Sequence, residues 1–248
     1  VALTVDLESA DSHYGLCERC VAAESLAFLV GVARAVRPAL SRLVPPKTER
    51  TIEEFYADLV EGVGELRDLL YRRLPLVAMP MHDVVTAVTQ VKWDVKELGF
   101  TQSAYVDTVA QRAAALAQVL DRSKDVLPAQ LRPVVLKSCV LHAMELLVEG
   151  YSRIRKMGPN TPLIISQDLQ VLKKAIEEST GLRPLPFLKH ADEFAKAFFL
   201  RPDSQAAILE WTRQHPGYPV HQVQGLITAV CSGEGSGGGG RGGLTSAL

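Results

Sequence analysis

The sequence predicts an all-α fold, a multi-helix bundle or elongated helical rod of about eight or nine helices. Apolar residues recur at helical spacing over most of the chain, whereas apolar–polar alternation never extends beyond about four or five residues. Aromatic residues make up only 6% of the chain, so Leu, Ala and Val dominate the candidate core, as in many helix bundles. The 248 residues can bury a sizeable core without disulfide or metal cross-links.

The first part of the chain begins irregularly and then becomes helical. Residues 1–14 lack periodicity, and we expect the helical domain to begin at residue 15 and to extend to residue 231. A first helix over about residues 15–41 should kink or end at Pro38, because the proline ring removes one helical hydrogen bond. Its core candidates are Leu26, Leu29 and Val30.

A second long helical pattern follows the break at VPPK. Thr51 is the expected N-cap, and Glu54 stands at the spacing of a capping box. The apolar stripe of this helix consists of Ile52, Phe55, Leu59, Val63, Leu66 and Leu70.

The next predicted helix contains Trp93, which lies on an unusual face. At 100° per residue the apolar face consists of Val84, Val88, Val91, Val95 and Leu98. Trp93 lies about 180° from this face, among polar residues. Either the helix is covered on both faces, or Trp93 is an exposed anchor for a partner, since tryptophan is enriched among interface hot spots. We expect burial against another helix of the domain, because tryptophan is highly buried on average.

The remainder of the domain contains six more helical patterns. Gly99 should end the helix of Trp93, and Thr101 should cap the next one. The six helices are expected over about residues 102–122, 128–154, 167–180, 189–200, 203–214 and 219–231. Ser166 is the expected N-cap of the third, and Gly181 should end it. The break GPNTP fits a subdivision near residues 158–165, and the Gly-rich residues 232–248 should form a flexible tail.

Composition and charge exclude several classes of protein. The formal net charge of −1 lacks the basic excess typical of nucleic-acid-binding proteins, so no nucleic-acid partner is expected. No apolar run reaches the roughly 20 residues that span a bilayer. A start at Val1 without a signal-peptide pattern is typical of a fragment of a longer protein. We expect a cytosolic protein whose four cysteines are reduced.

Cys17 and Cys20 have the C-x-x-C spacing of zinc sites and redox motifs. A structural zinc site needs a second close pair of ligands, but Cys139 and Cys231 stand singly and far away. A thioredoxin-like site needs a βαβ context, which a helical sequence lacks. We therefore expect two thiols at a helix start, without a metal or a cofactor, and the zinc or redox site remains the alternative.

No catalytic motif is present in the sequence. The six histidines form no H-E-x-x-H or other metal-binding spacing, and G-x-G-x-x-G, G-x-x-x-x-G-K-[ST] and G-x-S-x-G are missing. The run GSGGGG lacks the lysine and the helix that follow a phosphate-binding loop. The sequence therefore favours a protein that is not an enzyme and that works through its surfaces.

Arg153, Arg155 and Lys156 form a basic cluster at the end of the longest predicted helix. Positive charge at this end of a helix offsets the negative end of the helix dipole. The alternative is a small basic patch that binds an acidic partner or anionic lipid, which would need additional contacts for firm membrane binding. These three residues and Trp93 are the candidate partner or lipid contacts.

Six stretches resemble, in sequence and order, the syndetin C-terminal domain family. They are GLCERCVAAESLAFL, VKWDVKELGFTQSAYVD, VEGYSRIRK, GLRPLPF, AKAFFL and LEWTRQHPGYPVHQVQGLI. The resemblance covers about residues 15–231, and its most specific pieces are KWDVKE and the pair formed by EGY and LRPLP. The C-x-x-C motif and the Gly-rich end depart from the family pattern.

Syndetin is a subunit of the endosome-associated recycling protein complex, a multisubunit vesicle tether. The resemblance therefore implies a helical scaffold without catalysis, which helps to capture endosome-derived vesicles and promotes SNARE-dependent fusion and cargo recycling. It implies other tether subunits, SNAREs and small GTPases as partners, and a peripheral location at recycling endosomes or trans-Golgi network membranes. The alternative hypothesis is a peripheral membrane module that binds anionic headgroups through Arg153, Arg155 and Lys156, joined by Lys173 and Lys174.

Overall fold

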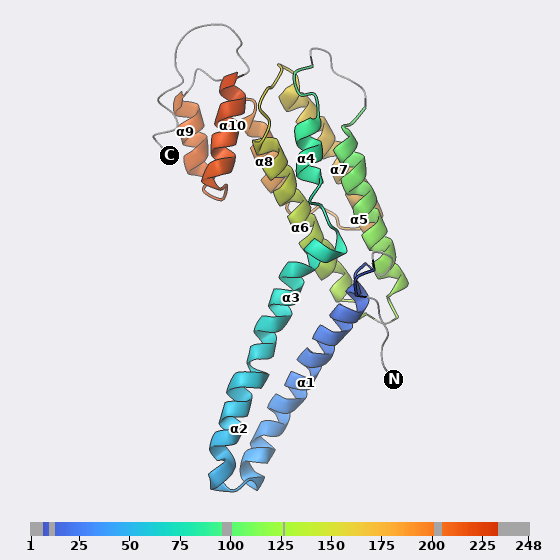
Figure 1. Ribbon diagram of the computed structural model, residues 1–248, viewed down its shortest axis with the longest axis vertical. Coiled ribbons are helices and arrows are strands. Elements are labelled where there is room, and N and C mark those ends of the chain that lie inside the picture. The colour runs from blue at the N-terminus through green and yellow to red at the C-terminus, as the bar shows by residue number, and fades with distance from the viewer. Residues whose placement is uncertain (1–6, 10–12, 96–100, 126, 201–204, 233–248) are drawn as a thin grey trace. The chain divides into compact units, whose positions relative to one another are not determined.

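Figure 1 shows the computed structural model of the chain, which describes residues 7–9, 13–95, 101–125, 127–200 and 205–232. These residues form helices and connecting turns and contain no strand, which confirms the predicted all-α class. Ten α-helices are present among them, or nine if α2 and α3, which a π-helix joins, are counted together. Gly99 and the glycine-rich tail from residue 233 onward lie outside the described residues.

The chain divides into two compact units. Unit 1 comprises Val1–Pro80 and Gln118–Cys139, and unit 2 comprises Met81–Ala117 and Val140–Leu248. No boundary falls in the break near residues 158–165. That connection is bound to the interior of unit 2, because the backbone N–H of Gly158 donates to the carbonyl oxygen of Trp93 at 3.1 Å.

Unit 1 is built around a helical hairpin. Its first arm is α1 (Leu16–Leu43), and a short 3₁₀ turn, η2 (Pro46–Thr48), reverses the chain. The second arm consists of α2 (Glu49–Phe55), the π-helix η3 (Tyr56–Val60) and α3 (Gly62–Ala78), and it runs back along α1 (Figure 1).

Tyrosine hydroxyls join the two arms of the hairpin. Tyr56 donates to the carbonyl oxygen of Ala33 at 2.6 Å, and Tyr71 donates to a carboxylate oxygen of Glu24 at 2.8 Å. Arg67 donates to the same Glu24 oxygen at 2.8 Å. Both tyrosine rings are buried, so each hydroxyl fixes the pairing of the arms at one level of the hairpin.

The buried side of α1 differs from the prediction. Leu26 and Leu29 are 41% and 58% exposed, and Val30 is half-buried. The buried residues of α1 are instead Leu16, Cys20 and Ala23, close to its start. Apolar residues occupy almost every side of α1, whereas the second arm covers only one of them. Periodicity alone does not select which side that is.

The first helix does not end at Pro38, one of the two outcomes expected there, and the predicted N-cap of the next helix is wrong. α1 continues through Pro38 to Leu43, in an exposed part of the helix where water can reach the carbonyl that the proline leaves without a donor. α2 begins at Glu49, before the predicted N-cap Thr51, because the 3₁₀ turn already directs the backbone into the helix.

Unit 2 contains the remaining helices, and α5 and α6 contribute residues to both units. The helices are α4 (Val84–Gln90), α5 (Ala104–Arg122), α6 (Leu131–Ser152), α7 (Thr161–Thr180), α8 (Leu188–Ala197), α9 (Gln205–Gln214) and α10 (Val220–Ser232). The three short helices predicted after residue 189 are confirmed by α8, α9 and α10. Gly181 is the C-cap of α7 with φ 75°, as predicted.

The start of α7 differs from the prediction. Asn160 is its N-cap, and the predicted cap Ser166 lies inside the helix. Pro162 occupies the first turn, where the missing N–H of a proline removes no helical hydrogen bond.

Trp93 does not lie on a helix, contrary to the prediction. α4 ends at Gln90, and Val91 adopts an extended conformation with ψ 138°. The Trp93 indole N–H donates to the carbonyl oxygen of Val88 at 2.9 Å, and the Trp93 carbonyl accepts from Gly158 and Thr161. These hydrogen bonds occupy carbonyl groups that a continued helix would use.

The Trp93 side chain is buried, as expected from the sequence. Its ring is 4% exposed and packs against Tyr105 and Tyr151, with ring centroids 6.5 and 6.4 Å away. Tyr105 in turn donates to the buried carboxylate of Asp168 at 2.7 Å. Burial raises the pKa of Tyr105 well above its ordinary value, so its hydroxyl stays protonated as the donor in this bond. Trp93 is thus part of the core of unit 2.

Candidate functional site

The basic cluster lies directly after the end of α6. This helix ends at Ser152, and Arg153, Arg155 and Lys156 are exposed. Arg153 and Arg155 line an open hollow of about 450 Å³ between α6 and α10, whereas Lys156 does not line it. The other lining residues are Glu149, Ser152, His221, Gln224, Gly225 and Thr228. All of them belong to unit 2.

Gly225 allows α10 to pack directly against the end of α6. A Cβ atom at position 225 would lie 1.9 Å from the carbonyl oxygen of Ser152. Such a contact is far shorter than any real Cβ contact, and the neighbouring atom is backbone, which does not move aside easily. Gly225 and Ser152, which both line the hollow, are therefore in close backbone contact.

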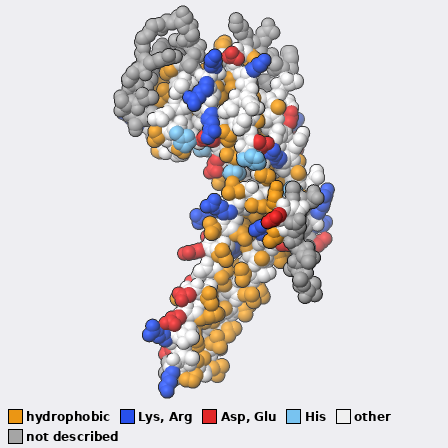
Figure 2. All heavy atoms as spheres, in the orientation of Figure 1, with side chains coloured by type: hydrophobic (Ala, Val, Ile, Leu, Met, Phe, Trp, Pro, Cys, Tyr) orange, Lys and Arg blue, Asp and Glu red, His pale blue; other side chains and the backbone are white. Residues whose placement is uncertain are grey.

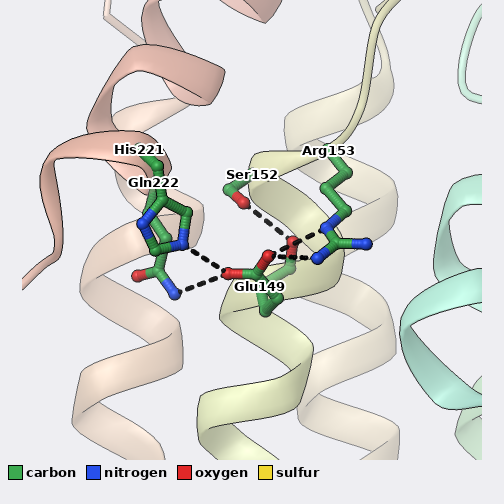
Figure 3. A network of polar contacts seen from close by, with 5 residues as sticks. All are labelled: Glu149, Ser152, Arg153, His221 and Gln222. Carbon is green, nitrogen blue, oxygen red and sulfur yellow. Dashed lines mark hydrogen bonds and ion pairs between the residues drawn. The ribbon is translucent and has the colours of Figure 1, made fainter. Parts of the chain in front are cut away.

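The carboxylate of Glu149 is the centre of a polar network in the hollow (Figure 3). Arg153 donates to its Oε1 through Nε at 2.8 Å and lies 2.7 Å away through Nη2. His221 Nε2 and Gln222 Nε2 both donate to its Oε2 at 3.0 Å. Glu149 lies in the last turn of α6, and Arg153 follows the end of that helix. His221 and Gln222 lie at the start of α10, so the network joins the two helices (Figure 3).

This network keeps Glu149 ionised. Burial of the carboxylate favours its protonated form, but the hydrogen bonds from Gln222, His221 and Arg153 outweigh that effect and lower the pKa of Glu149 to about 2. The charge of Arg153 is in turn balanced by Glu149 at hydrogen-bond distance. Arg155 and Lys156 follow Arg153 and are exposed as well.

Gln222 is held in one orientation by the same network. Its amide nitrogen faces the Glu149 carboxylate, because the reversed amide would place an oxygen against the negative charge. The amide oxygen is buried, and no hydrogen-bond donor reaches it within the part of the chain that the structure describes. The network thus satisfies the carboxylate completely and the amide only in part.

The Glu149 carboxylate of the hollow is not suited to acid–base chemistry. It already accepts from three side chains and has a low pKa, so at neutral pH it neither donates nor readily takes up a proton. Within the described ranges, no group of three His, Cys, Asp or Glu side chains is arranged to hold a metal ion. Among the described helices, none combines the length and the hydropathy needed to cross a membrane.

The C-x-x-C cysteines lie in unit 1 and take part in its packing. Cys17 Sγ donates to Ser123 Oγ at 2.9 Å, and Cys20 is fully buried in the core. Burial, together with the nearby Cys17 and Glu24, raises the pKa of Cys20 to about 11. A thiol with so high a pKa remains protonated at neutral pH, unlike the thiolates of redox motifs.

Sequence patterns did not identify most of the residues that form the hollow. Arg153 and Arg155 were predicted as contacts from the run of basic residues. Glu149, His221 and Gly225 were not, nor was Gln222, which belongs to the network but does not line the hollow. The carboxylate and the α10 side chains are more than 70 positions apart, and no short motif contains both. The only signal was that VEGYSRIRK and HQVQG both occur within the stretches that resemble the syndetin family.

Comparison with known proteins supports that resemblance. A family model described as "Syndetin, C-terminal" matches residues 13–236, which include most of both units and all the lining residues of the hollow. Syndetin of Rattus norvegicus, Mus musculus and Gallus gallus is each 29% identical to the chain over 231 residues, or 92% of the chain. The chain spans 24% of the length of these curated relatives. Since the family model matches nearly the whole chain, this protein belongs to the syndetin C-terminal family.

Proposed function

We propose that this chain is a non-catalytic scaffold module of a vesicle-tethering complex subunit, which acts in endosomal recycling and retrograde traffic through protein–protein contacts. The observation that carries the proposal is the family match over residues 13–236. The absence of catalytic motifs from the sequence and the fully hydrogen-bonded carboxylate of the hollow agree with it. The module works at the surface of endosome-derived or trans-Golgi network membranes as part of a longer subunit.

The hollow between α6 and α10 is the proposed contact site for an acidic segment of another tether subunit, a SNARE or a small GTPase. Gly225 and the Glu149 network hold its two helices together. Its exposed basic residues are Arg153, which pairs with Glu149, and Arg155, with Lys156 next to it in the chain. Exposed charges of this kind steer a partner and set its register more than they add affinity. Trp93 makes no part of this contact surface, because its ring is buried in unit 2.

Affinity capture with matched variants tests this function. The purified chain should capture tether subunits, SNAREs or small GTPases from lysate of its own cells. Arg155→Glu combined with Lys156→Glu should reduce that capture at least about tenfold, since like charge then faces an acidic partner. Arg72→Glu combined with Arg73→Glu is the control, because it reverses an adjacent pair of exposed charges on α3 in unit 1. Failure of the unaltered chain to capture any protein of these three classes would refute the proposal.

A second candidate function is the binding of anionic lipid headgroups. It is favoured by the exposure of Arg153, Arg155 and Lys156 within four consecutive residues. Flotation with phosphoinositide vesicles distinguishes it from the first. Salt-sensitive binding that is lost on substitution of all three residues by Ala supports a membrane module, whereas no binding at physiological salt removes it.

A further inference from the structure

The hairpin of unit 1 has two halves that are packed differently. Its proximal half comprises residues 15–30 and 65–78, and its distal half comprises residues 31–64. The proximal half is bound to the rest of unit 1, because Ser138 Oγ donates to the carbonyl oxygen of Tyr71 at 3.3 Å. The side chains that the two arms bury in this half are Leu16, Cys20, Ala23, Tyr71, Leu74, Pro75 and Ala78.

The distal half buries little of its apolar surface. Among its described side chains only Tyr56 and Val60 are buried. Six of its large apolar side chains are exposed instead, from 37% for Leu40 to 82% for Leu43. Figure 2 shows hydrophobic side chains at the surface along much of the hairpin in the view drawn. Because the burial of apolar surface is the main stabilising contribution to folding, the distal half is held less firmly than the proximal half.

Tyr56 fastens the two arms of the distal half to each other. Its hydroxyl donates to the carbonyl oxygen of Ala33 at 2.6 Å, and the Arg37 guanidinium lies 4.8 Å from the centroid of its ring. The ion pair of Arg34 and Glu61 also joins the arms, but both side chains are exposed, so it adds little stability. One buried tyrosine therefore carries much of the contact between the arms in this half.

The second arm is irregular at the position of this tyrosine. Its helix widens to a π-helix over Tyr56–Val60, in which the N–H of Glu61 donates to the carbonyl oxygen of Tyr56 at 3.0 Å. π-Helical turns are rare within α-helices, and they often occur at functional sites. The side chain that fastens the distal half thus stands on the least regular turn of the arm.

Three glycines lie at one level of the hairpin, where its two halves meet. Gly62 and Gly64 follow the π-helix on the second arm. Gly31 stands opposite Gly64 on α1, because the antiparallel arms pair Arg34 with Glu61 three residues away. A Cβ atom at any of the three positions would meet no atom within 4 Å, so packing does not require glycine there. Glycine inside a helix weakens it relative to alanine, so both arms are weakened at the same level.

We propose that the distal half of the hairpin opens as a separate unit. Residues 31–64 lose their helical hydrogen bonds together, and Tyr56 leaves α1, while the proximal half stays folded. This opening breaks both arms at the level of the glycines and gives up little buried surface, so it occurs far more often than the unfolding of unit 1. The hairpin can therefore change its shape at its distal end without loss of the unit 1 core. This inference does not rest on the proposed tethering function.

Amide hydrogen exchange of the full 248-residue chain, followed by mass spectrometry of its peptides, tests the proposal. After correction for intrinsic rates, amides of the distal half should exchange at least about tenfold faster than helical amides of the proximal half. The fast exchange should extend across both arms of the distal half, because these open together. Equal protection of the two halves would overturn the proposal.

Two matched variants distinguish separate opening from unfolding of the whole hairpin. Tyr56 and Tyr71 are both buried on the second arm, and each donates its hydroxyl to α1. Tyr56→Phe should accelerate exchange in the distal half about fivefold, through the loss of one hydrogen bond. Tyr71→Phe should accelerate exchange in the proximal half alone, because the distal half opens without breaking the bond of Tyr71. Leu74→Ala makes the same comparison with a larger perturbation of the proximal half.

The response of the distal amides to the proximal variants decides the question. If Leu74→Ala accelerates the distal amides as much as the proximal ones, the hairpin opens only as a whole and the proposal fails. Gly62→Ala tests the boundary, since a better helix former at that position should slow distal exchange about fourfold. Distal exchange that Gly62→Ala leaves unchanged would place the boundary elsewhere and would also overturn the proposal.

Discussion

Gly225→Ala should destabilise unit 2, although alanine is the better helix former. The added Cβ would stand 1.9 Å from the Ser152 carbonyl oxygen and 2.9 Å from its carbonyl carbon. Relief of this overlap requires a displacement of α10 from α6 by about 1 Å, and overpacking of this kind costs about 1–3 kcal/mol or more. The gain in helix propensity returns at most about 1 kcal/mol. Because the overlap is large, the cost should lie at the upper end of this range, and we expect a net loss of about 2 kcal/mol in the free energy of unfolding.

Urea unfolding followed by tryptophan fluorescence measures this loss. Both tryptophans, Trp93 and Trp211, belong to unit 2, so the signal reports on the unit that contains the substitution. Gly31→Ala is the matched control, because Gly31 lies inside α1 with no atom within 4 Å of the added Cβ. Followed by circular dichroism, it should stabilise unit 1 by about 0.5–1 kcal/mol. The steric explanation is refuted if Gly225→Ala proves as stable as the unaltered chain.

Three further predictions concern the Glu149 network and the buried contacts of Trp93. Trp93→Phe should cost about 2 kcal/mol in urea unfolding, because Val88 loses its indole donor and the smaller ring leaves a void; an unchanged midpoint would show that this hydrogen bond is dispensable. Thr161→Val keeps the size of the side chain but removes its hydrogen bonds to Trp93 and Gly158, so a loss of about 1–3 kcal/mol is expected, and a fully stable variant would contradict it. Glu149 has a pKa of about 2 in the folded state, below the ordinary 4.5, so its contribution is present above pH 4.5 and is lost as the pH falls toward 2. Thermal unfolding between pH 2 and 7 should therefore show a smaller acid decline for Glu149→Gln, and equal declines would exclude this origin.

The end of α7 was predicted correctly from a local signal. Gly181 ends α7 because a glycine accepts φ 75°, and such a signal needs no knowledge of the tertiary structure. The end of α4 was missed because it depends on residues far along the chain. Gly158 and Thr161 bind the Trp93 carbonyl across about 65 residues, and the valine periodicity of this stretch gives no warning of it.

The candidate site was predictable to the same limited extent. A run of basic residues is visible in the sequence, and so Arg153 and Arg155 could be chosen as contacts. The pair formed by Glu149 and Arg153 depends on helical spacing, which brings residues four apart to one side. The hydrogen bond from His221 to Glu149 depends on the approach of α10. The second condition is tertiary, since it needs the glycine at position 225 to meet the end of α6.

The disagreement over α1 is informative about the whole unit. The sequence placed Leu26 and Leu29 in a core because a helix that is apolar on most sides is normally buried. The structure leaves both exposed, since the second arm covers only one side of α1. If the apolar side of α1 had been assigned wrongly, the side that the structure exposes would be polar. That side is apolar as well. The prediction was therefore right about the hydrophobicity of the helix and wrong about the burial of Leu26 and Leu29.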